Sequence, residues 1–170
     1  MPVMVALSGL PGVGKSAVAR ALAARTGALW LRIDAIEQAL RDSFLRTDDI
    51  ADGGYAAARA VAEGALGQGI DVIADGVNPL ALTREAWRAA AGNAGARCID
   101  VELVCGDRAE HRRRVETRHA EVAGLSLPTW AEVEARDYEA WTAPVLRIDT
   151  AAVGPEDVAT RIAQRMEGTG

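Results

Sequence analysis

An eight-residue stretch near the beginning of the chain has the residue types and spacing needed to hold a chain of phosphates. It reads Gly-Leu-Pro-Gly-Val-Gly-Lys-Ser from Gly9 to Ser16, which fits the pattern G-x-x-x-x-G-K-S. Glycines let the backbone bend tightly and aim successive N–H groups at an anion. Lys15 would reach the β and γ phosphates of a nucleotide, and the Ser16 hydroxyl would bind Mg²⁺. The residues expected around the phosphates are Gly9, Leu10, Pro11, Gly12, Val13, Gly14, Lys15, Ser16 and Ala17.

The segments on both sides of this stretch support the same interpretation. Val3–Ser8 is a short apolar run that predicts a strand, and Lys15–Arg25 is alanine-rich and predicts a helix. The positive end of that helix would point at the bound phosphates. Lys15 is also the only lysine in the chain. The alternative is a glycine-rich turn that binds nothing; the strand, the helix and the lone lysine favour the phosphate loop.

Asp34 is the first candidate for a catalytic acid–base group. It directly follows the apolar run Leu29–Ile33, and the carboxyl ends of parallel strands line the ligand crevice of an open α/β sheet. There it would accept a proton from a substrate hydroxyl or orient the nucleophile. Asp is also a favoured N-cap, so Asp34 could cap a helix over Ala35–Arg41, and the two roles are compatible.

Asp75 is a candidate for a magnesium site. It ends the apolar run Ile70–Ala74, and an apolar strand that ends in Asp is typical of the residue that holds Mg²⁺ directly or through water. With the phosphate loop, this predicts that Ser16 and Asp75 bind the metal. The alternative is a turn residue before Gly76.

A basic segment in the second half of the chain could supply positive charge to a transferred phosphate. Arg114 and Arg118 are four residues apart, which places them on one face of a helix. Arginines on a mobile lid can stabilise the charge of phosphoryl transfer and close the site against water. The sequence therefore predicts a lid over about residues 108–128. The alternative is a solvated helix face paired with Glu110 and Glu116.

Histidines and tryptophans give weaker signals. His111 and His119 have no metal-ligand partners nearby and are expected at the surface or in the lid. Trp87, Trp130 and Trp141 occupy helical positions and are expected in the core or in a pocket wall.

Five short apolar runs predict strands, and they alternate with predicted helices. The predicted strands are Val3–Ser8, Leu29–Ile33, Ile70–Ala74, Arg97–Val104 and Val145–Ile148. The predicted helices are Lys15–Arg25, Ala35–Arg41, Tyr55–Leu66, Thr83–Ala91, Arg108–Thr117, Trp130–Trp141 and Pro155 to about Met166. Continuous apolar strands are typical of a parallel sheet covered on both faces. The prediction is an α/β three-layer sandwich, with a five-stranded parallel sheet and a short helical lid.

Local signals mark several helix ends. Asp107 can cap the helix that follows it, and Thr129 can do the same with Glu132 completing a capping box. Pro155 suits the first position of the last helix, and Gly27 suits the end of the first.

Composition and charge narrow the classes of protein. The chain has 170 residues, 49% of them hydrophobic, which suits a single domain over residues 1–170. Its net charge of −5 argues against nucleic acid as a general partner. Cys98 and Cys105 are too few and too poorly spaced for a disulfide scaffold or a zinc site. No segment has the roughly 18 apolar residues needed to span a bilayer, and no signal peptide precedes the phosphate loop. We therefore expect a cytoplasmic protein without a membrane partner, as a monomer or a homodimer.

Taken jointly, these motifs resemble the small P-loop kinases related to polynucleotide kinase, zeta toxin and chloramphenicol phosphotransferase, which are often grouped with ATPases by name only. The resemblance covers nearly the whole chain. It rests on Gly9–Ser16, Asp34, Ile73–Gly76, the Arg114 and Arg118 pair, and Ile148–Thr150. It implies the P-loop NTPase fold, with ATP and Mg²⁺ as cofactors and a small-molecule hydroxyl as phosphoryl acceptor. It further implies that Asp34 is the general base, that Arg114 and Arg118 grip the ATP phosphates, and that Asp149 and Thr150 lie near the adenine.

The chain departs from its relatives around the acceptor. Many relatives have Arg three residues after the catalytic Asp, where this chain has Glu37; an acceptor without a phosphate would need no such Arg. Shikimate kinases use Asp-x-Asp, but Arg32 occupies the first of those positions here. Their triple-glycine segment is also absent after the third strand. By position, Tyr55, the loop Ser43–Gly54 and the helix after it would form much of the acceptor pocket.

Rival functions are separated by simple features. A GTPase would need Asn-Lys-x-Asp, and the only lysine is Lys15. A motor ATPase would need a second helical domain, for which the chain has no room. Two alternatives to a small-molecule kinase stay open. One is a non-metabolic ATPase or a nucleotide-binding sensor; the intact set Lys15, Ser16 and Asp34 is evidence against it. The other is a toxin-like kinase that acts on a nucleotide sugar.

Overall fold

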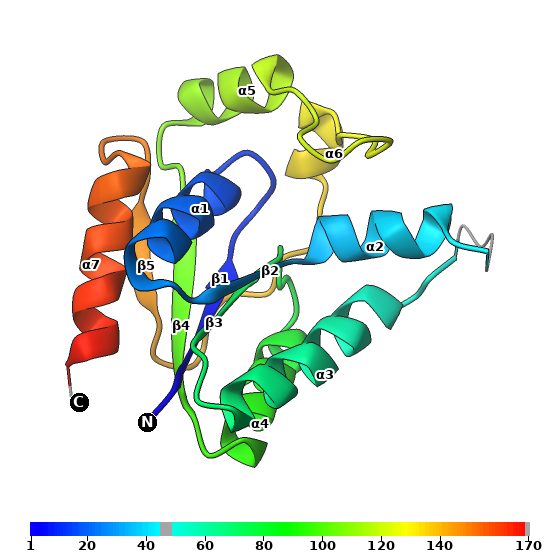
Figure 1. Cartoon of the computed structure of the whole chain (residues 1–170). Helices are drawn as coiled ribbons and strands as arrows, with labels where there is room; N and C mark the ends of the chain where they lie inside the picture. Colours follow the sequence, from blue (N-terminus) through cyan, green and yellow to red (C-terminus); the bar gives the residue numbers. More distant parts are fainter. Residues whose placement is uncertain (45–48, 169–170) are drawn as a thin grey trace.

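β1 (Val3–Ser8) lies at the centre of a five-stranded sheet in the computed structural model, which describes residues 1–44 and 49–168 (Figure 1). The other strands are β2 (Leu29–Arg32), β3 (Val72–Asp75), β4 (Arg97–Val104) and β5 (Leu146–Asp149). The order across the sheet is β2-β3-β1-β4-β5, and every neighbouring pair is parallel. The predicted five-stranded parallel sheet is therefore confirmed.

Helices cover both faces of this sheet. They are α1 (Lys15–Thr26), α2 (Ile33–Asp42), α3 (Gly53–Gly67), α4 (Ala81–Asn93), α5 (Arg108–Thr117), α6 (Trp130–Glu134) and α7 (Pro155–Glu167). α1 and α7 lie side by side on one face, and α3 and α4 lie on the other (Figure 1). The predicted three-layer sandwich is confirmed.

The two faces of β1 explain why its residues are apolar without interruption. Val3, Val5 and Leu7 pack into the core with α1 and α7, whereas Met4 and Ala6 pack with α3, α4 and Trp87. All of them are at most 3% exposed. Each side chain of β1 therefore leaves water, and polar residues are first tolerated where the strand ends at the phosphate loop.

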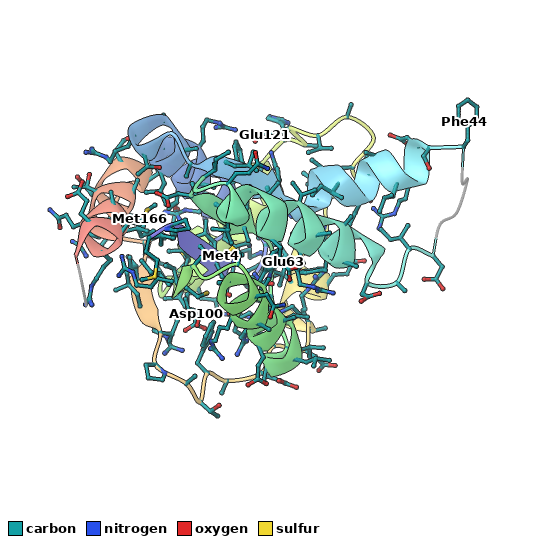
Figure 2. All side chains as sticks on the ribbon, turned by 60° about the horizontal axis from the view of Figure 1, so that its bottom comes forward. Met4, Phe44, Glu63, Asp100, Glu121 and Met166 are labelled. Carbon is teal, nitrogen blue, oxygen red and sulfur yellow. The ribbon has the colours of Figure 1, made fainter. Side chains whose placement is uncertain are left out.

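The carboxyl ends of the strands meet at one edge of the sheet, where α5 and α6 lie over the loop that follows β1 (Figure 1). Leu7 pairs with Asp75 and Ser8 pairs with Glu102, so the phosphate loop starts between the ends of β3 and β4. α2 projects away from the same edge, and Figure 2 shows Phe44 beyond its end pointing away from the molecule.

Most helix-end predictions are confirmed. The Asp107 side chain accepts hydrogen bonds from the backbone of Ala109 and Glu110. Thr129 and Glu132 form the complete capping box. Pro155 begins α7, and Gly27 ends α1 in the left-handed region with φ of 73°.

The predicted helix Trp130–Trp141 is wrong beyond Glu134, because a distant arginine holds the following segment in an irregular conformation. Arg84 of α4 is only 2% exposed and donates a hydrogen bond of 2.7 Å to the Glu139 carbonyl oxygen. Its guanidinium stacks over the rings of Tyr138 and Trp141, 4.9 and 4.3 Å from their centroids. This bonding replaces the hydrogen bonds that a longer helix would make within itself.

Other boundaries differ less. α2 already begins at Ile33, so Asp34 lies in its first turn rather than before it. Of the predicted loop Ser43–Gly54, residues 45–48 lie outside the described part, and α3 starts at Gly53. No helix within residues 1–44 and 49–168 is both long and apolar enough to cross a membrane.

Candidate active site

The phosphate loop adopts a conformation that requires glycine at its first position. Gly9 has φ of 140°, and a Cβ there would lie 2.3 Å from the Leu103 carbonyl oxygen of β4. Gly12 and Gly14 also have positive φ, at 87° and 98°. Since only glycine adopts such angles without strain, the glycines of the motif are explained by the backbone itself.

Lys15 is held inside the loop. Its amine donates hydrogen bonds of 2.8 and 3.0 Å to the carbonyl oxygens of Gly9 and Leu10, and the residue is only 9% exposed. Burial lowers the pKa of the amine to about 8, although the nearby Asp75 and Asp34 carboxylates oppose that shift. A bound phosphate chain would add the negative charge that keeps this amine protonated.

Ser16 and Asp75 lie close together at the end of the phosphate loop. The Asp75 carboxylate accepts a hydrogen bond of 3.2 Å from the Trp30 indole. Burial raises the pKa of Asp75, while Lys15 and the nearby Ser16 hydroxyl and Trp30 indole lower it. Mg²⁺ takes few protein oxygens and keeps phosphates and waters as its other ligands, so this pair fits it. The described residues contain no cluster of three or more His, Cys, Asp or Glu that could hold a metal by themselves.

A cavity of about 810 Å³ opens at this edge of the sheet. It is lined by residues of the phosphate loop, of α2 along its length, of the end of β3 and of the segment 118–128, and by Arg114 and Arg136. The structure brings together the residues that the sequence predicts to be catalytic: Lys15, Asp34, Arg114 and Arg118 all line this cavity.

Asp34 stands in the cavity without a structural partner. Its side chain makes no hydrogen bond or ion pair with any residue in the described ranges, and it lies close enough to Lys15, Glu37 and Arg118 to act on their protonation. The alternative role as a helix cap is wrong, because Arg32 occupies the N-cap position of α2 and no side chain bonds there. The carboxylate is thus free to meet a substrate.

Arg114 and Arg118 differ in their surroundings. Arg114 donates a hydrogen bond of 2.7 Å to Glu110 and two bonds of 3.0 Å to Thr150. Arg118 is half-buried, and within the described chain its Nε and Nη2 have no hydrogen-bond partner. The expectation that both project from one helix is wrong: α5 ends at Thr117, and Arg118 has an extended backbone. Both still reach the same cavity.

Thr150 joins the phosphate loop to the end of the sheet. Its hydroxyl lies 2.7 Å from the Val13 carbonyl oxygen, and its backbone N–H bonds to Val104 at 2.8 Å. It also lines a second cavity of about 270 Å³ beside α1, together with Gly14, Ala17, Val18, Arg114, Val153, Gly154 and Pro155. Asp149 does not line this cavity; instead it accepts backbone hydrogen bonds from Gly106 and Ala151.

His111 is buried, so the expectation of a surface position is wrong; it lies in α5, within the range predicted for the lid. It is 7% exposed, and its Nε2 lies 2.8 Å from the Pro11 carbonyl oxygen of the phosphate loop. Its ring packs edge-to-face with the Trp130 ring, with 5.1 Å between the ring centroids. Val115, one turn later, packs so closely that a Cβ on Gly12 would lie 2.5 Å from its methyl group. In the sequence, the four-residue spacing of His111 and Val115 in an otherwise charged helix is the signal that could have indicated a buried helix face.

Tyr55 is not part of the cavity wall, contrary to expectation. Its hydroxyl accepts a hydrogen bond from the Asn78 backbone, and its ring lies 6.4 Å from that of Trp87. The described residues of Ser43–Gly54 also stay outside the wall. The wall also contains Glu37, Gln38, Arg41 and Asp42 of α2, residues 124–128 and Arg136.

Residues 4–137 match the family model described as AAA domain. This chain belongs to that AAA domain family. Among curated proteins, none matches its sequence. The match runs from β1 to just beyond α6, so the AAA domain contains the phosphate loop, Asp34, Asp75, Arg114 and Arg118.

Solved structures, two of them of kinases, share the fold of this AAA domain at low identity. The Mycobacterium tuberculosis APS kinase CysC, in complex with AMPPNP and APS, is 19% identical with a TM-score of 0.67, and the match covers 98% of each chain. A gluconokinase from Sinorhizobium meliloti is 19% identical with a TM-score of 0.66, over 98% of this chain and 94% of that one. Chaetomium thermophilum Kti12 with ADP-AlF3 is 20% identical with a TM-score of 0.68, over 97% of this chain and all of that one. The predicted P-loop kinase fold is confirmed.

Proposed function

We propose that the protein transfers the γ-phosphoryl group of ATP to a hydroxyl group of a small molecule. One observation carries this proposal: an unpaired carboxylate, Asp34, faces a buried lysine and a half-buried arginine, Arg118, across the cavity entered by the phosphate loop. A nucleotide-binding sensor would need the loop but would have no use for a free carboxylate at its end.

The two cavities suit the two parts of ATP. The phosphates would lie on the N–H groups of the phosphate loop at the start of α1, and the base would enter the smaller cavity beside Thr150. Arg114 and Ala17 line both cavities and would lie between base and phosphates. The similar structures that hold AMPPNP or ADP-AlF3 support ATP as the ligand.

Mg²⁺ would be held by Ser16 and Asp75 and would supply charge to the β and γ phosphates when bound. Lys15 would leave the carbonyl oxygens of Gly9 and Leu10 and bind the same phosphates. These residues orient the γ-phosphoryl group toward the larger cavity, where an acceptor can approach in line.

Asp34 would act on the acceptor. As the acceptor oxygen forms its bond to phosphorus and ADP leaves, the hydroxyl proton passes to the Asp34 carboxylate. Arg118 has donor groups without partners and would stabilise the charge that develops on the transferred group. The moving segment we propose, residues 118–128, would then exclude water from the cavity.

The test is an acceptor screen with a matched inactive variant. Sugars, nucleosides and antibiotics are incubated with ATP and Mg²⁺, and product is followed by mass spectrometry together with ADP release. Lys15→Ala should abolish turnover, whereas Arg112→Ala, on the exposed side of α5, should not change it. Wild-type turnover by Lys15→Ala at saturating ATP would make the proposed function wrong.

A further inference from the structure

Two side chains of the neighbouring strand β2 could donate hydrogen bonds to Asp75. Trp30 and Arg32 are two residues apart, so they lie on the same face of the sheet. In the parallel register Arg32 is directly opposite Asp75, whereas Trp30 is opposite Ile73. From the register alone, we would expect the Asp75 carboxylate to pair with the arginine.

The observed hydrogen bonds are the reverse of that expectation. The Trp30 indole N–H donates to Oδ2 of Asp75 at 3.2 Å. Arg32 bonds through Nη1 to Glu121 at 2.8 Å, and within residues 1–44 and 49–168 it forms no ion pair with Asp75. Arg32 is still near enough for its charge to lower the pKa of the Asp75 carboxyl. The carboxylate is therefore bonded to a neutral donor although a cation lies close by.

Glu121 holds Arg32 in this arrangement. Its carboxylate bonds to Arg20 at 2.7 Å as well as to Arg32, and both guanidinium groups lie over the Trp30 ring, 5.7 and 5.9 Å from its centroid. The Arg32 side chain is only 19% exposed, and its buried Nε has no hydrogen-bond partner among the described residues. Arg32 thus has an unused donor, and without Glu121 it would be free to pair with Asp75.

The type of donor decides what the Asp75 carboxylate can still bind. An indole N–H donates one hydrogen bond and accepts none, so it engages one carboxylate oxygen and leaves the other for a metal. A guanidinium commonly engages both oxygens through paired N–H groups, and its positive charge would repel a divalent cation. The observed arrangement therefore favours a metal at Asp75, and an ion pair with Arg32 would compete with it.

We propose that Trp30 and Glu121 are positioning residues of the magnesium site: Trp30 orients the Asp75 carboxylate, and Glu121 keeps Arg32 from pairing with it. The inference rests on the proposed function and deepens it, because it concerns how the metal-holding carboxylate is kept available. Since Glu121 belongs to the segment 118–128, the affinity for Mg²⁺ then depends on where that segment lies.

The experiment measures the linkage between Mg²⁺ and nucleotide instead of turnover. The Kd for AMPPNP is determined by calorimetry at free Mg²⁺ concentrations from zero, in EDTA, to saturation, and the concentration that gives half of the full effect is compared between variants. Trp30→Phe keeps an aromatic ring but removes the N–H. It should raise the half-effect concentration by roughly 10- to 100-fold and leave the Kd in EDTA within about twofold, as expected for a residue that orients a metal ligand. Urea unfolding checks that the variant is folded.

Glu121 is tested by a double-substitution cycle. Glu121→Ala should raise the half-effect Mg²⁺ concentration by roughly tenfold, because it releases Arg32. Adding Arg32→Met should return the value toward that of the wild type, whereas Arg32→Met alone should not raise it. Arg20→Gln is the matched control: it breaks the other ion pair of Glu121 but leaves Arg32 paired, so the dependence on Mg²⁺ should stay unchanged.

The possible failures can be told apart. The inference would be overturned if Trp30→Phe kept the Mg²⁺ dependence of the wild type, or if the double variant resembled Glu121→Ala. It would also be overturned if Mg²⁺ did not affect AMPPNP binding to the wild type, or if Trp30→Phe did not unfold cooperatively, which would make Trp30 a structural residue. Failure of the wild type to bind AMPPNP at any Mg²⁺ concentration would instead refute the proposed function, and the inference with it.

Discussion

The imidazole Nε2 of His111 lies 2.8 Å from the carbonyl oxygen of Pro11, so a helix one hundred residues along the chain is bonded to the phosphate loop. Val115 packs against Gly12 beside this bond. The shape of the loop therefore depends on α5 as well as on its own glycines. A carbonyl can only accept, so the bond requires a proton on Nε2.

Replacing His111 with alanine should therefore disturb both stability and nucleotide binding. The change removes a buried hydrogen bond and the ring that packs on Trp130, and we expect the free energy of unfolding in urea to fall by about 1–3 kcal/mol. AMPPNP affinity should fall as well. His119→Ala changes an exposed histidine and should alter stability by no more than about 0.5 kcal/mol. If His111→Ala and His119→Ala changed the free energy of unfolding and the AMPPNP affinity equally, His111 would not support the phosphate loop.

The unpaired carboxylate of Asp34 allows a clean test of the general base. Asp34→Asn should lower kcat for phosphoryl transfer by roughly 10²- to 10⁴-fold, because a positioned base contributes that much. The Kd for AMPPNP should stay within about twofold, since the side chain faces the acceptor. Asp157→Asn, on the exposed first turn of α7, serves as the control. Loss of nucleotide binding with transfer retained per bound ATP would assign Asp34 a structural role.

The contrast between Arg114 and Arg118 predicts opposite results for two similar substitutions. Arg118→Ala should lower kcat strongly and leave the free energy of unfolding unchanged, because its Nε and Nη2 bond to no other described residue. Arg114→Ala breaks the contacts with Glu110 and Thr150, so it should lower stability by about 1–3 kcal/mol and weaken ATP binding. Urea unfolding and steady-state kinetics of both variants check this. Matching stability losses would show that Arg118 is structural.

Hydrogen exchange should divide the predicted lid into a fixed and a moving part. His111 and Val115 anchor α5, so residues 108–117 should be protected with and without nucleotide. The segment 118–128 contains Gly124, with φ of 79°, and Glu121, which is labelled in Figure 2. Glu121 forms ion pairs with Arg20 of α1 and Arg32 of β2. AMPPNP should raise protection in this segment. If AMPPNP raised protection equally over residues 108–128, or raised it nowhere in that range, the division into a fixed α5 and a moving segment 118–128 would be wrong.

The lowered pKa of Lys15 predicts unusual chemical reactivity. With burial lowering its pKa from 10.5 to about 8, the amine of the free protein is neutral to a greater extent near pH 8 than a free lysine amine, and its neutral fraction falls as the pH falls. Pulse acylation at pH 6.5–9, read by mass spectrometry against free Nα-acetyl-lysine, should label Lys15 faster than the reference. AMPPNP with Mg²⁺ should block labelling. A labelling rate of Lys15 equal to that of the reference amine, or unchanged by AMPPNP, would contradict a buried amine with a lowered pKa in the nucleotide site.

The elements that the sequence predicts well are those decided by their own residues. β1, α1 and α5 follow from a continuous apolar run, a glycine-lysine turn and an Asp107 cap. The end of α6 could not be found in this way, because Arg84, about fifty residues earlier, bonds to Glu139 and withdraws the following segment from the helix. Tertiary contacts of this kind outweigh local helix preference.

The same distinction holds for the candidate site. Lys15, Asp34 and Asp75 all line the cavity, as the sequence predicts, because each lies at or after the carboxyl end of a recognisable strand. His111 and Arg136 owe their positions to contacts between distant elements, and their neighbours in the sequence are ordinary charged residues. The sequence does not show that the Tyr55 hydroxyl accepts a hydrogen bond from the Asn78 backbone, which holds the side chain outside the cavity wall.

The central place of β1 has a consequence for how the protein folds. The strand precedes all its partners in the chain, and it gains its neighbours only when β3 and β4 close long loops onto it. Such distant pairing is slow. The phosphate loop at its end is also bonded to His111 and Thr150, so the proposed nucleotide site would be complete only in the native state. A nucleotide at about 1,000 times its Kd would then add about 4 kcal/mol to the stability of the whole domain.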